Sequence, residues 1–311
     1  MAGIDNSLVL GLGHISLDTK LGMYYQDISP SLAHIEKGVF AALDQEGIPY
    51  SIEGENRKYI SVVTIQYGLS CCDLVLKGIE IDENKKKIKN CLRWLDEQKE
   101  EFNGSFVWRN EFNEQYRIEE GWISGMYQGQ ALSLYLRAYQ LFDNTDYLET
   151  AEKVFISFSI DYIDGGFKRI DKEGCVWFEE YPTEQPSFVL NGFIYAMLGI
   201  LDLYRVTKRE DVKAVWDSCI NTLIVNMPKY DVWYWSVYDQ LKQELVSYYY
   251  QKNVHLPLMQ IMFRLTKNKL FERYAIKWEK NLNNPIHKLV TKVMYRIQPR
   301  LKKLRGQNLK R

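Results

Sequence analysis

The stretch WFEEYPTEQPSFVLNGFIYAMLGILDL, residues 177–203, leads from an acidic and aromatic loop into an apolar helix. Pro182 and Pro186 fix their own backbone and disfavour helical geometry at the residue before each of them, so the loop is expected to be extended. Ser187 is then in position to cap a helix that begins near Phe188. The stretch therefore predicts a loop that ends at the mouth of a buried helix.

The loop half of this stretch carries side chains suited to chemistry. Glu179, Glu180 and Tyr181 come directly before the first proline, and Asn191 lies in the first turns of the helix. Two carboxylates and a phenol at one helix mouth suit proton transfer or the binding of a polar ligand. A surface loop around a buried tyrosine explains the same residues, so both interpretations stay open at this point.

The apolar helix of residues 187–207 is one of four along the chain, each followed by an amphipathic helix. The four apolar helices are expected to begin near residues 62, 124, 187 and 254. A helix that is apolar on all sides is buried, whereas an amphipathic helix lies at the surface. Hairpins of this kind stack into a toroid or an open solenoid, and we favour the toroid. The predicted fold class is all-α, an (α/α) toroid of about four helical hairpins over residues 61–285.

The regions on either side of the toroid differ in character. Residues 1–60 are punctuated by Gly and Pro, which predicts an irregular N-terminal segment packed on the toroid, with one helix at residues 31–45. Residues 286–311 form a basic amphipathic tail that has, from His287 onward, nine Lys and Arg and no acidic residue. Such a tail either makes a peripheral contact with an anionic membrane or is a solvated segment.

Composition and motifs exclude several classes of protein. The chain has 40 basic and 40 acidic residues, so subtracting the nine basic residues of the tail leaves 31 against 40. A body with this net negative charge is unsuited to general nucleic-acid binding. The four histidines are scattered and no phosphate-loop motif occurs, so neither a metal nor a cofactor is expected. Five cysteines without CxxC spacing indicate free thiols in a reducing, cytoplasmic compartment.

Three long connections join successive hairpins, at residues 103–121, 164–186 and 228–250. Each links an outer helix to the next inner helix, so all three are expected at one end of the toroid, and loops of this length are usually functional. Tryptophan and tyrosine concentrate in these loops, and aromatic faces pack on the C–H surfaces of sugar rings. The sequence therefore predicts an aromatic sugar-binding cleft with Trp177 in its wall.

Several segments, taken in order, resemble the C-terminal helical domain of the D-glucuronyl C5-epimerases. They are QYGLS at 66–70, SGMYQGQALS at 124–133, EEYPT at 179–183, SFVLNGFIYAMLG at 187–199 and VYD at 237–239. The resemblance extends over residues 15–282. Members of this family invert carbon 5 of a glucuronic acid residue within a polysaccharide. The resemblance implies a helical toroid that uses tyrosines as acid and base without a cofactor.

The resemblance also implies roles for individual residues. Tyr181 of EEYPT and Tyr238 of VYD are the expected proton-transfer residues, and Glu180 is their polar partner. The side chains expected to line the sugar site are Gln128, Gln130 and Asn191.

This chain departs from the family pattern at two places. The family has an arginine soon after the second tyrosine, whereas the sequence YDQLK at 238–242 leaves Lys242 to bind the substrate carboxylate as a point charge. The family also has a third tyrosine four residues before a histidine. Counting back from His255 reaches Gln251, and a shift of one residue brings in Tyr250 as the third candidate. His255 itself has either a role in the polar site or a structural one.

The resulting hypothesis is an isomerase that epimerises a glucuronic acid residue of a polysaccharide through tyrosine-mediated proton abstraction and reprotonation. Tyrosine has a reference pKa near 10, so a neighbouring cation such as Lys242 is expected to activate it as a base. The alternative is a non-catalytic glycan-binding relative that lost the arginine. A hydrolase or lyase is less suited, because Glu179 and Glu180 are adjacent and point in different directions. The expected partners are a uronic-acid polysaccharide, an anionic membrane surface and a second copy in a homodimer.

Overall fold

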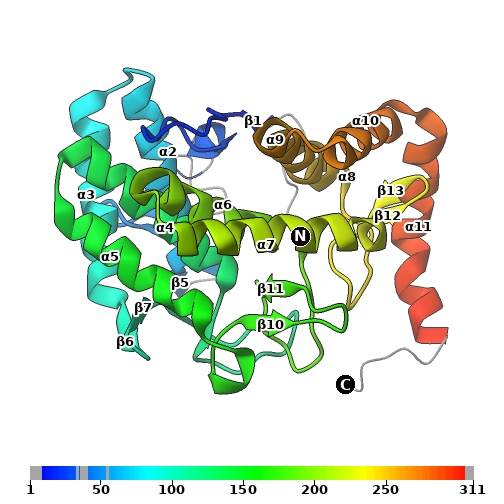
Figure 1. Cartoon of the computed structure of the whole chain (residues 1–311). Coiled ribbons are helices and arrows are strands. Elements are labelled where there is room, and N and C mark those ends of the chain that lie inside the picture. The colour runs from blue at the N-terminus through cyan, green and yellow to red at the C-terminus, as the bar shows by residue number, and fades with distance from the viewer. Residues whose placement is uncertain (1–8, 33–34, 36–40, 54–55, 305–311) are drawn as a thin grey trace.

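The computed structural model describes residues 9–32, 35, 41–53 and 56–304, and its helices form four hairpins arranged as an (α/α) toroid (Figure 1). The first helix of each hairpin is the inner one. The hairpins are α2 (Ser61–Leu76) with α3 (Ile81–Gln98), α4 (Gly125–Phe142) with α5 (Thr145–Ile156), α6 (Leu190–Thr207) with α7 (Glu210–Asn226), and the continuous α8 (Tyr248–Tyr250), η5 (Gln251–His255) and α9 (Leu256–Thr266) with α10 (Lys269–Asn283). The predicted toroid is therefore confirmed.

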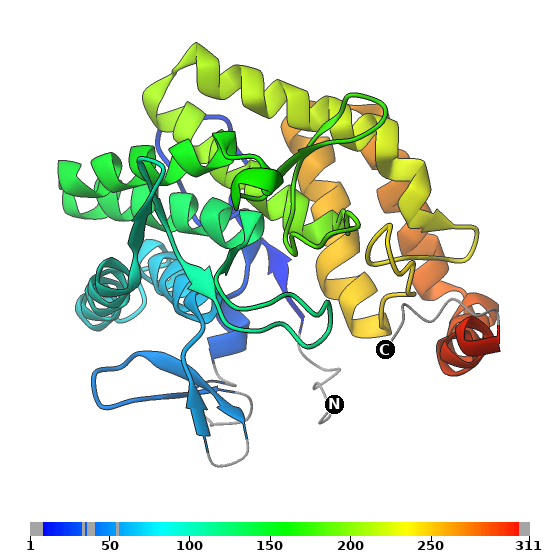
Figure 2. The ribbon, with the colours of Figure 1, turned by 90° about the horizontal axis from the view of Figure 1, so that it is seen from below.

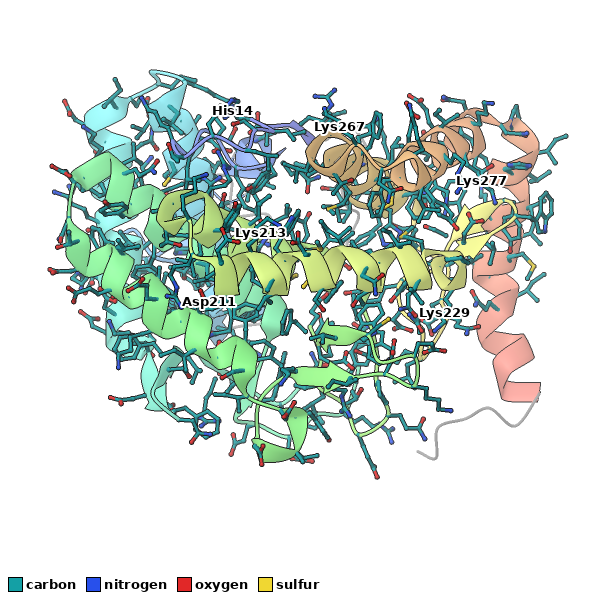
Figure 3. The ribbon with its side chains drawn as sticks, in the orientation of Figure 1. His14, Asp211, Lys213, Lys229, Lys267 and Lys277 are labelled. Atoms are coloured by element: carbon teal, nitrogen blue, oxygen red, sulfur yellow. The ribbon has the colours of Figure 1, made fainter. Side chains whose placement is uncertain are left out.

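The inner helices are buried on nearly all sides because small residues let their backbones meet. A Cβ atom added to Gly199 of α6 would collide with the backbone of Gly129 in α4, and one added to Gly129 would collide with Ala196. The outer helices bury one stripe each, and charged residues such as Asp211 and Lys213 of α7 stand on the outside (Figure 3). The predicted division into inner and outer helices is confirmed.

The N-terminal segment closes the ring between the first and fourth hairpins. It contains β1 (Gly11–Leu12), β2 (Gln26–Asp27) and the short 3-10 turn η1 (Ser29–Ser31). The backbone N–H of Tyr24 donates to Asp73 Oδ1 of α2 at 2.7 Å, and that of Leu10 donates to Asn253 Oδ1 at 3.0 Å. Gln26 also donates to the backbone oxygen of Asn253. The segment is therefore part of the toroid's packing on two sides.

The helix expected at residues 31–45 is wrong over its described C-terminal part. Residues 41–58 contain an antiparallel sheet of β3 (Ala41–Leu43), β4 (Pro49–Glu53) and β5 (Asn56–Lys58). Asp44 accepts the backbone N–H groups of Glu46 and Ile48 at 2.9 and 2.8 Å, and Gly47 takes a φ of +80°. This turn, which begins at Asp44 and contains Gly47, reverses the chain and favours a hairpin over a helix. Residues 33–34 and 36–40 of the predicted helix lie outside the described residues.

The three long connections lie at one end of the toroid, on the face seen in Figure 2. They carry short antiparallel hairpins that the sequence did not predict. These are β6 (Glu100–Phe102) with β7 (Ser105–Val107), β8 (Arg109–Asn110) with β9 (Trp122–Ile123), β10 (Lys168–Ile170) with β11 (Val176–Phe178), and β12 (Asp231–Val232) with β13 (Trp235–Ser236).

The tail begins as a helix, α11 (Pro285–Leu304), along one edge of the molecule (Figure 1). One face of α11 packs on the connection of residues 228–250, where Gln298 Nε2 donates to the backbone oxygen of Gln243 at 2.7 Å. Within the described residues, no helix is both long and apolar enough to cross a membrane. The homodimer, the cytoplasmic location and the division at residues 60 and 285 stay predictions.

Candidate active site

Glu179 anchors the loop that carries the candidate acid–base residues. Its Oε2 atom accepts the hydroxyl of Ser187 at 2.7 Å and the backbone N–H of Phe188 at 3.0 Å, and its Oε1 lies 3.4 Å from Arg169 Nε. Ser187 therefore does not cap the helix, which begins at Leu190. Phe188 has a φ of +46°, a left-handed conformation that is held by its bond to the carboxylate. Burial raises the pKa of Glu179 to about 7.

Glu180 points the other way and forms the centre of the site. It is 3% exposed and packs against Gly192 in the first turn of α6, where any Cβ atom would collide with its carboxyl group. Tyr238 Oη donates to Glu180 Oε1 at 3.3 Å, and Asn191 Nδ2 donates to Oε2 at 3.4 Å. Tyr181 is a second phenol beside this carboxylate, and it lowers the pKa of Glu180 from the value that burial alone would give. The glycine thus creates the space that a buried acid needs.

The three candidate tyrosines converge on this carboxylate from different parts of the chain. The ring centroids of Tyr238 and Tyr250 are 5.5 Å apart with an interplanar angle of 69°, so the two phenols are neighbours. Tyr181 lies close enough to Glu180 and Tyr238 for both of them to affect the pKa of its phenol. All three tyrosines are partly exposed, whereas the carboxylate is buried behind them. The structure therefore brings Tyr181, Glu180, Tyr238 and Tyr250 together in one cluster of proton donors and acceptors.

The electrostatics of the site assign different protonation states to its members. Burial raises the pKa of Glu180 to about 7, so this carboxyl is divided between its acid and its base form at neutral pH. Burial, followed by the charge of Glu180, raises the pKa of the phenols of Tyr181, Tyr238 and Tyr250 well above the usual value. These tyrosines are therefore proton donors in the free protein, and the carboxylate is their acceptor.

A turn of π-helix explains the one-residue shift between Tyr250 and His255. Residues 251–255 form η5, in which backbone bonds join residues five apart, so side chains five apart lie on the same face. The ring centroids of Tyr250 and His255 are accordingly 5.4 Å apart. The inserted residue thus keeps the tyrosine and the histidine together, as a spacing of four does in an α-helix.

His255 is held as a neutral imidazole. Its Nδ1 lies 2.8 Å from Ser236 Oγ, and Ser236 donates its own proton to Gln251, so Nδ1 is the donor and Nε2 is the acceptor. Burial lowers the pKa of His255 to about 3. Among the described residues, His255 Nε2 has no hydrogen-bond partner, and neither has Asn191 Oδ1. Both atoms are buried acceptors suited to the hydroxyl groups of a ligand.

Three residues expected in the sugar site lie in the core. Trp177 is 1% exposed, stacks on Phe188 and donates its indole N–H to Asp171 at 2.9 Å. Gln128 is buried and donates to the backbone oxygen of Phe106 and to Ser157, on the side of α5. Gln130 is buried and accepts from Gln66 at 3.0 Å. Their hydrogen bonds stabilise the toroid in place of contacting a ligand.

Lys242 contacts the site indirectly, through the ring of Tyr116. Its Nζ lies 4.1 Å from the ring centroid of Tyr116 and donates to the backbone oxygen of Gln115. Tyr116 stacks on Tyr181 with centroids 4.5 Å apart and donates its hydroxyl to Asp239. The cation is therefore placed to hold Tyr116 against Tyr181, in contrast to the expected role of activating a tyrosine base.

The aromatic residues expected in the cleft wall from the long connections include Tyr116 and Trp122, but Tyr127 was not predicted. The ring of Trp122 lies 5.7 Å from that of Tyr181 and 6.2 Å from that of Tyr127, and Glu180 contributes to the raised pKa of Tyr127. Tyr127 stands in the first turn of α4, and the N-termini of the inner helices surround the site. The position of Tyr127 in the first turn of an inner helix is the feature of the sequence that could have identified it as a site residue. The described residues contain no group of three or more His, Cys, Asp or Glu side chains placed to hold a metal ion.

The fold and the site define a class: an (α/α) toroid with an acid–base cluster at one mouth. A GH76 α-mannanase of Bacteroides thetaiotaomicron matches this fold with a TM-score of 0.51 and 13% identity, over 83% of this chain and 67% of that one. A family 76 glycoside hydrolase from a bovine strain of the same species has a TM-score of 0.52 and 13% identity, over 82% of this chain and 56% of that one. Identities this low show a common fold alone.

Within this class, the chain belongs to the family described as D-glucuronyl C5-epimerase C-terminus, whose model matches residues 98–280. A D-glucuronyl C5-epimerase of Caenorhabditis elegans is 30% identical over 178 residues, covering 52% of this chain and 29% of that protein. An uncharacterised protein of Methanocaldococcus jannaschii is 29% identical over 176 residues, covering 55% of this chain and 56% of that protein. The chain thus spans less than two thirds of either relative. Residues 15–97, which the sequence analysis had included, lie outside the family match.

Proposed function

We propose that this protein is an isomerase that inverts carbon 5 of a glucuronic acid residue within a polysaccharide. The observation that carries the proposal is the buried carboxylate of Glu180, which accepts a hydrogen bond from Tyr238 and lies beside Tyr181, two tyrosines from different connections. Membership of the family and the 30% identical relative named D-glucuronyl C5-epimerase support the same reaction.

The reaction requires a weakly acidic proton to leave one face of the sugar ring and another proton to arrive at the opposite face. Carbon 5 lies beside the sugar carboxylate, so loss of its proton develops negative charge on the carboxylate oxygens, which must be stabilised by hydrogen bonds. Acid and base groups from separate loops can flank one ring. Donors with raised pKa values, such as these phenols, suit the protonation half of the reaction.

The cluster of Tyr181, Glu180, Tyr238 and Tyr250 offers a route by which the protons balance. Tyr181 takes the proton from carbon 5 as its own phenolic proton passes to Glu180. Glu180 returns a proton to Tyr238 as a phenol of the Tyr238–Tyr250 pair protonates carbon 5 on the other face. One C–H bond breaks, one forms, and every side chain recovers its starting protonation state. His255 Nε2 and Asn191 Oδ1 accept sugar hydroxyls in this arrangement.

The second candidate function is a non-catalytic glycan-binding protein. It is favoured by one observation: Lys242, which replaces the family's arginine, is engaged with Tyr116 and Gln115. A substrate carboxylate would then lack the two-pronged cation expected in this family.

Incubation with glucuronate-containing polysaccharides in deuterated water separates the two functions. An epimerase is expected to incorporate deuterium at carbon 5, detected by NMR spectroscopy or mass spectrometry of the isolated sugar, and to yield iduronate. A binding protein leaves carbon 5 protiated. A lyase would create an unsaturated product that absorbs in the ultraviolet, and either of these two results would contradict the proposal.

We also propose that α11 binds an anionic membrane surface. The face opposite its packed side exposes Ile286 at 68%, Leu289 at 63% and Val293 at 44%, spaced along one stripe. Lys292 and Arg296 are exposed beside this stripe, and from His287 onward the chain has nine basic residues and no acidic one. Apolar side chains flanked by cations are the pattern of a helix that lies in the interface of an anionic bilayer.

The double variant Leu289→Ser, Val293→Ser is expected to lose most membrane binding. Full burial of each side chain contributes about 1.5–3 kcal/mol, so the partition coefficient should fall by at least about tenfold. Flotation with phosphatidylglycerol vesicles measures the effect, with phosphatidylcholine vesicles as the uncharged comparison. Ile163→Ser, which changes an 86% exposed residue far along the chain, is the matched control. Equal flotation of the double variant and the control would contradict the proposal.

A further inference from the structure

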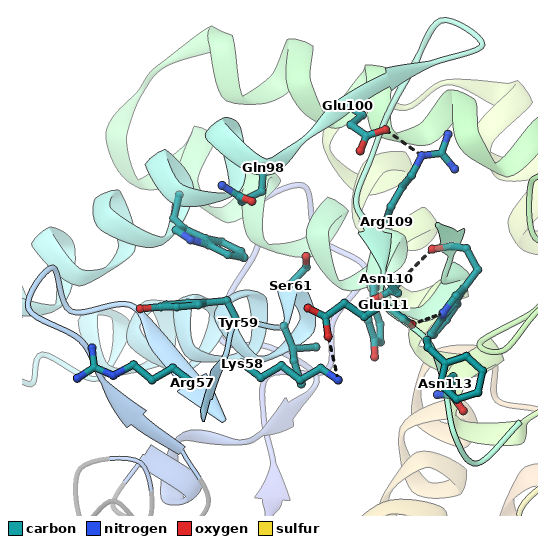
Figure 4. Close-up of a pocket in the computed structure, with 15 residues that line it drawn as sticks. Arg57, Lys58, Tyr59, Ser61, Gln98, Glu100, Arg109, Asn110, Glu111 and Asn113 are labelled. Carbon is teal, nitrogen blue, oxygen red and sulfur yellow. Dashed lines mark hydrogen bonds and ion pairs between the residues drawn. The ribbon is translucent and has the colours of Figure 1, made fainter. Parts of the chain in front are cut away.

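A groove with a volume of about 430 Å³ adjoins the tyrosine cluster (Figure 4). One wall is formed by residues 57–61 and by Trp94 of α3, and the other by residues 109–113 and Trp122. The volume lies within the range of pockets for small organic ligands. Residues 57–61 and Trp94 precede the region matched by the family model.

The groove leads to the candidate acid–base residues. Trp122 and Tyr127 line it, and the ring of Trp122 lies 5.7 Å from that of Tyr181. A ligand in the groove would therefore be separated from Tyr181 by one indole ring.

The lining of the groove is that of a saccharide site. Tyr59 is 37% exposed and stacks on Trp94 with ring centroids 6.1 Å apart at 28°, and Phe112 is 49% exposed. Asn113 and Gln98 supply amides beside these rings. Exposed aromatic faces with a few amides bind the C–H faces and the hydroxyls of a sugar.

The charges within the groove limit the kind of sugar. Lys58 lies 3.1 Å from Glu111, and Arg109 lies 2.8 Å from Glu100, so acidic partners offset two of the cations (Figure 4). A groove of such mixed charge is unsuited to a densely anionic strand such as nucleic acid. It suits a sugar unit with no charge or one charge.

We infer that the groove is a second subsite that binds the sugar residue adjoining the glucuronic acid in the polymer. This inference rests on the proposed function for the identity of the polymer. The subsite lets the protein act on residues inside a chain, because the neighbouring unit fixes the register of the reacting unit.

The variant Tyr59→Ala tests the subsite, because it removes the exposed ring. Binding of a labelled glucuronate-containing polysaccharide is expected to weaken by about three- to tenfold, the usual contribution of one aromatic contact. Binding of methyl glucuronide, which fills the reacting site alone, should not change. Tyr59→Phe keeps the ring and removes only the hydroxyl that donates to Asp44, so it should bind the polymer as the wild type does. Tyr295→Ala, at a 47% exposed tyrosine of α11, is the matched control.

Two measurements keep this inference separate from the proposed function. If the wild type exchanges deuterium at carbon 5 and Tyr59→Ala binds polymer normally, the subsite is overturned and the epimerase stands. If the wild type exchanges no deuterium but Tyr59→Ala still loses polymer affinity, the subsite stands and the epimerase is overturned. Tyr59→Phe sharing the defect of Tyr59→Ala would assign the loss to the Asp44 contact and also overturn the subsite.

Discussion

The variant Glu180→Gln is expected to slow hydrogen exchange at carbon 5 by about 10²–10⁴-fold, the usual contribution of a positioned acid or base. Glutamine keeps the size of the side chain and one acceptor oxygen for Tyr238, but it cannot take up a proton. The tyrosines should therefore keep their places while the route between them is broken. The measurement is deuterium incorporation into the polysaccharide, with polysaccharide binding expected to persist.

The pH dependence of the wild type should report the same carboxyl. Because burial raises the pKa of Glu180 to about 7, its base form fills as the pH rises through 7, and the exchange rate should rise over that interval and then level off. The variant Glu180→Gln should lack this rise of the exchange rate with pH. Glu184→Gln changes an exposed acid of the same connection and should leave both rate and profile unaltered. A Glu180→Gln variant with a rate near that of the wild type would exclude the carboxylate from the proton route.

The helical framework could be predicted from sequence because apolar periodicity does not depend on distant residues. Inner helices expected near residues 62, 124 and 187 begin at Ser61, Gly125 and Leu190. The fourth was expected near residue 254 but begins at Tyr248, ahead of Pro257. The π turn before this proline lets the helix continue through residues 251–255, and its spacing leaves no periodic pattern that a sequence could reveal.

Only those site residues that belong to linear sequence motifs could be predicted. The motif at 124–133 pointed to Gln128, but consecutive helical residues differ in direction by about 100°, so Tyr127 faces the site while Gln128 faces α5. Trp177 of β11 lies in the core because it packs on Phe188 and Phe193, and its neighbour Phe178 is equally buried. Short strands of two or three residues are too brief for a period, so the hairpins of the connections were not predicted.

The variant Asp202→Asn is expected to lower the free energy of unfolding by about 3–5 kcal/mol, because it leaves two buried cations without their carboxylate. Asp202 is fully buried in α6, and its oxygens lie 2.6 Å from Arg137 and 3.1 Å from Arg205. Tyr25 of the N-terminal segment donates to it at 2.7 Å. Urea denaturation measures the loss. Asp211→Asn removes an exposed partner of Arg209 (Figure 3) and should cost at most about 1 kcal/mol.

The same substitution should loosen the N-terminal segment before the rest of the toroid. The two arginines also donate to backbone oxygens of this segment, Arg137 to Gly22 at 3.1 Å and Arg205 to Asp18 at 2.8 Å. Their reorientation around a neutral side chain would weaken those bonds together with that of Tyr25, so amide hydrogen exchange in residues 18–27 should accelerate more than in α4 or α6. Gln26 in this segment accepts from Tyr195, whose raised pKa reflects burial and then Glu180, so the loosening extends to the edge of the acid–base cluster. Uniform acceleration across all helices would instead indicate global destabilisation without a separate role for this segment in closing the ring.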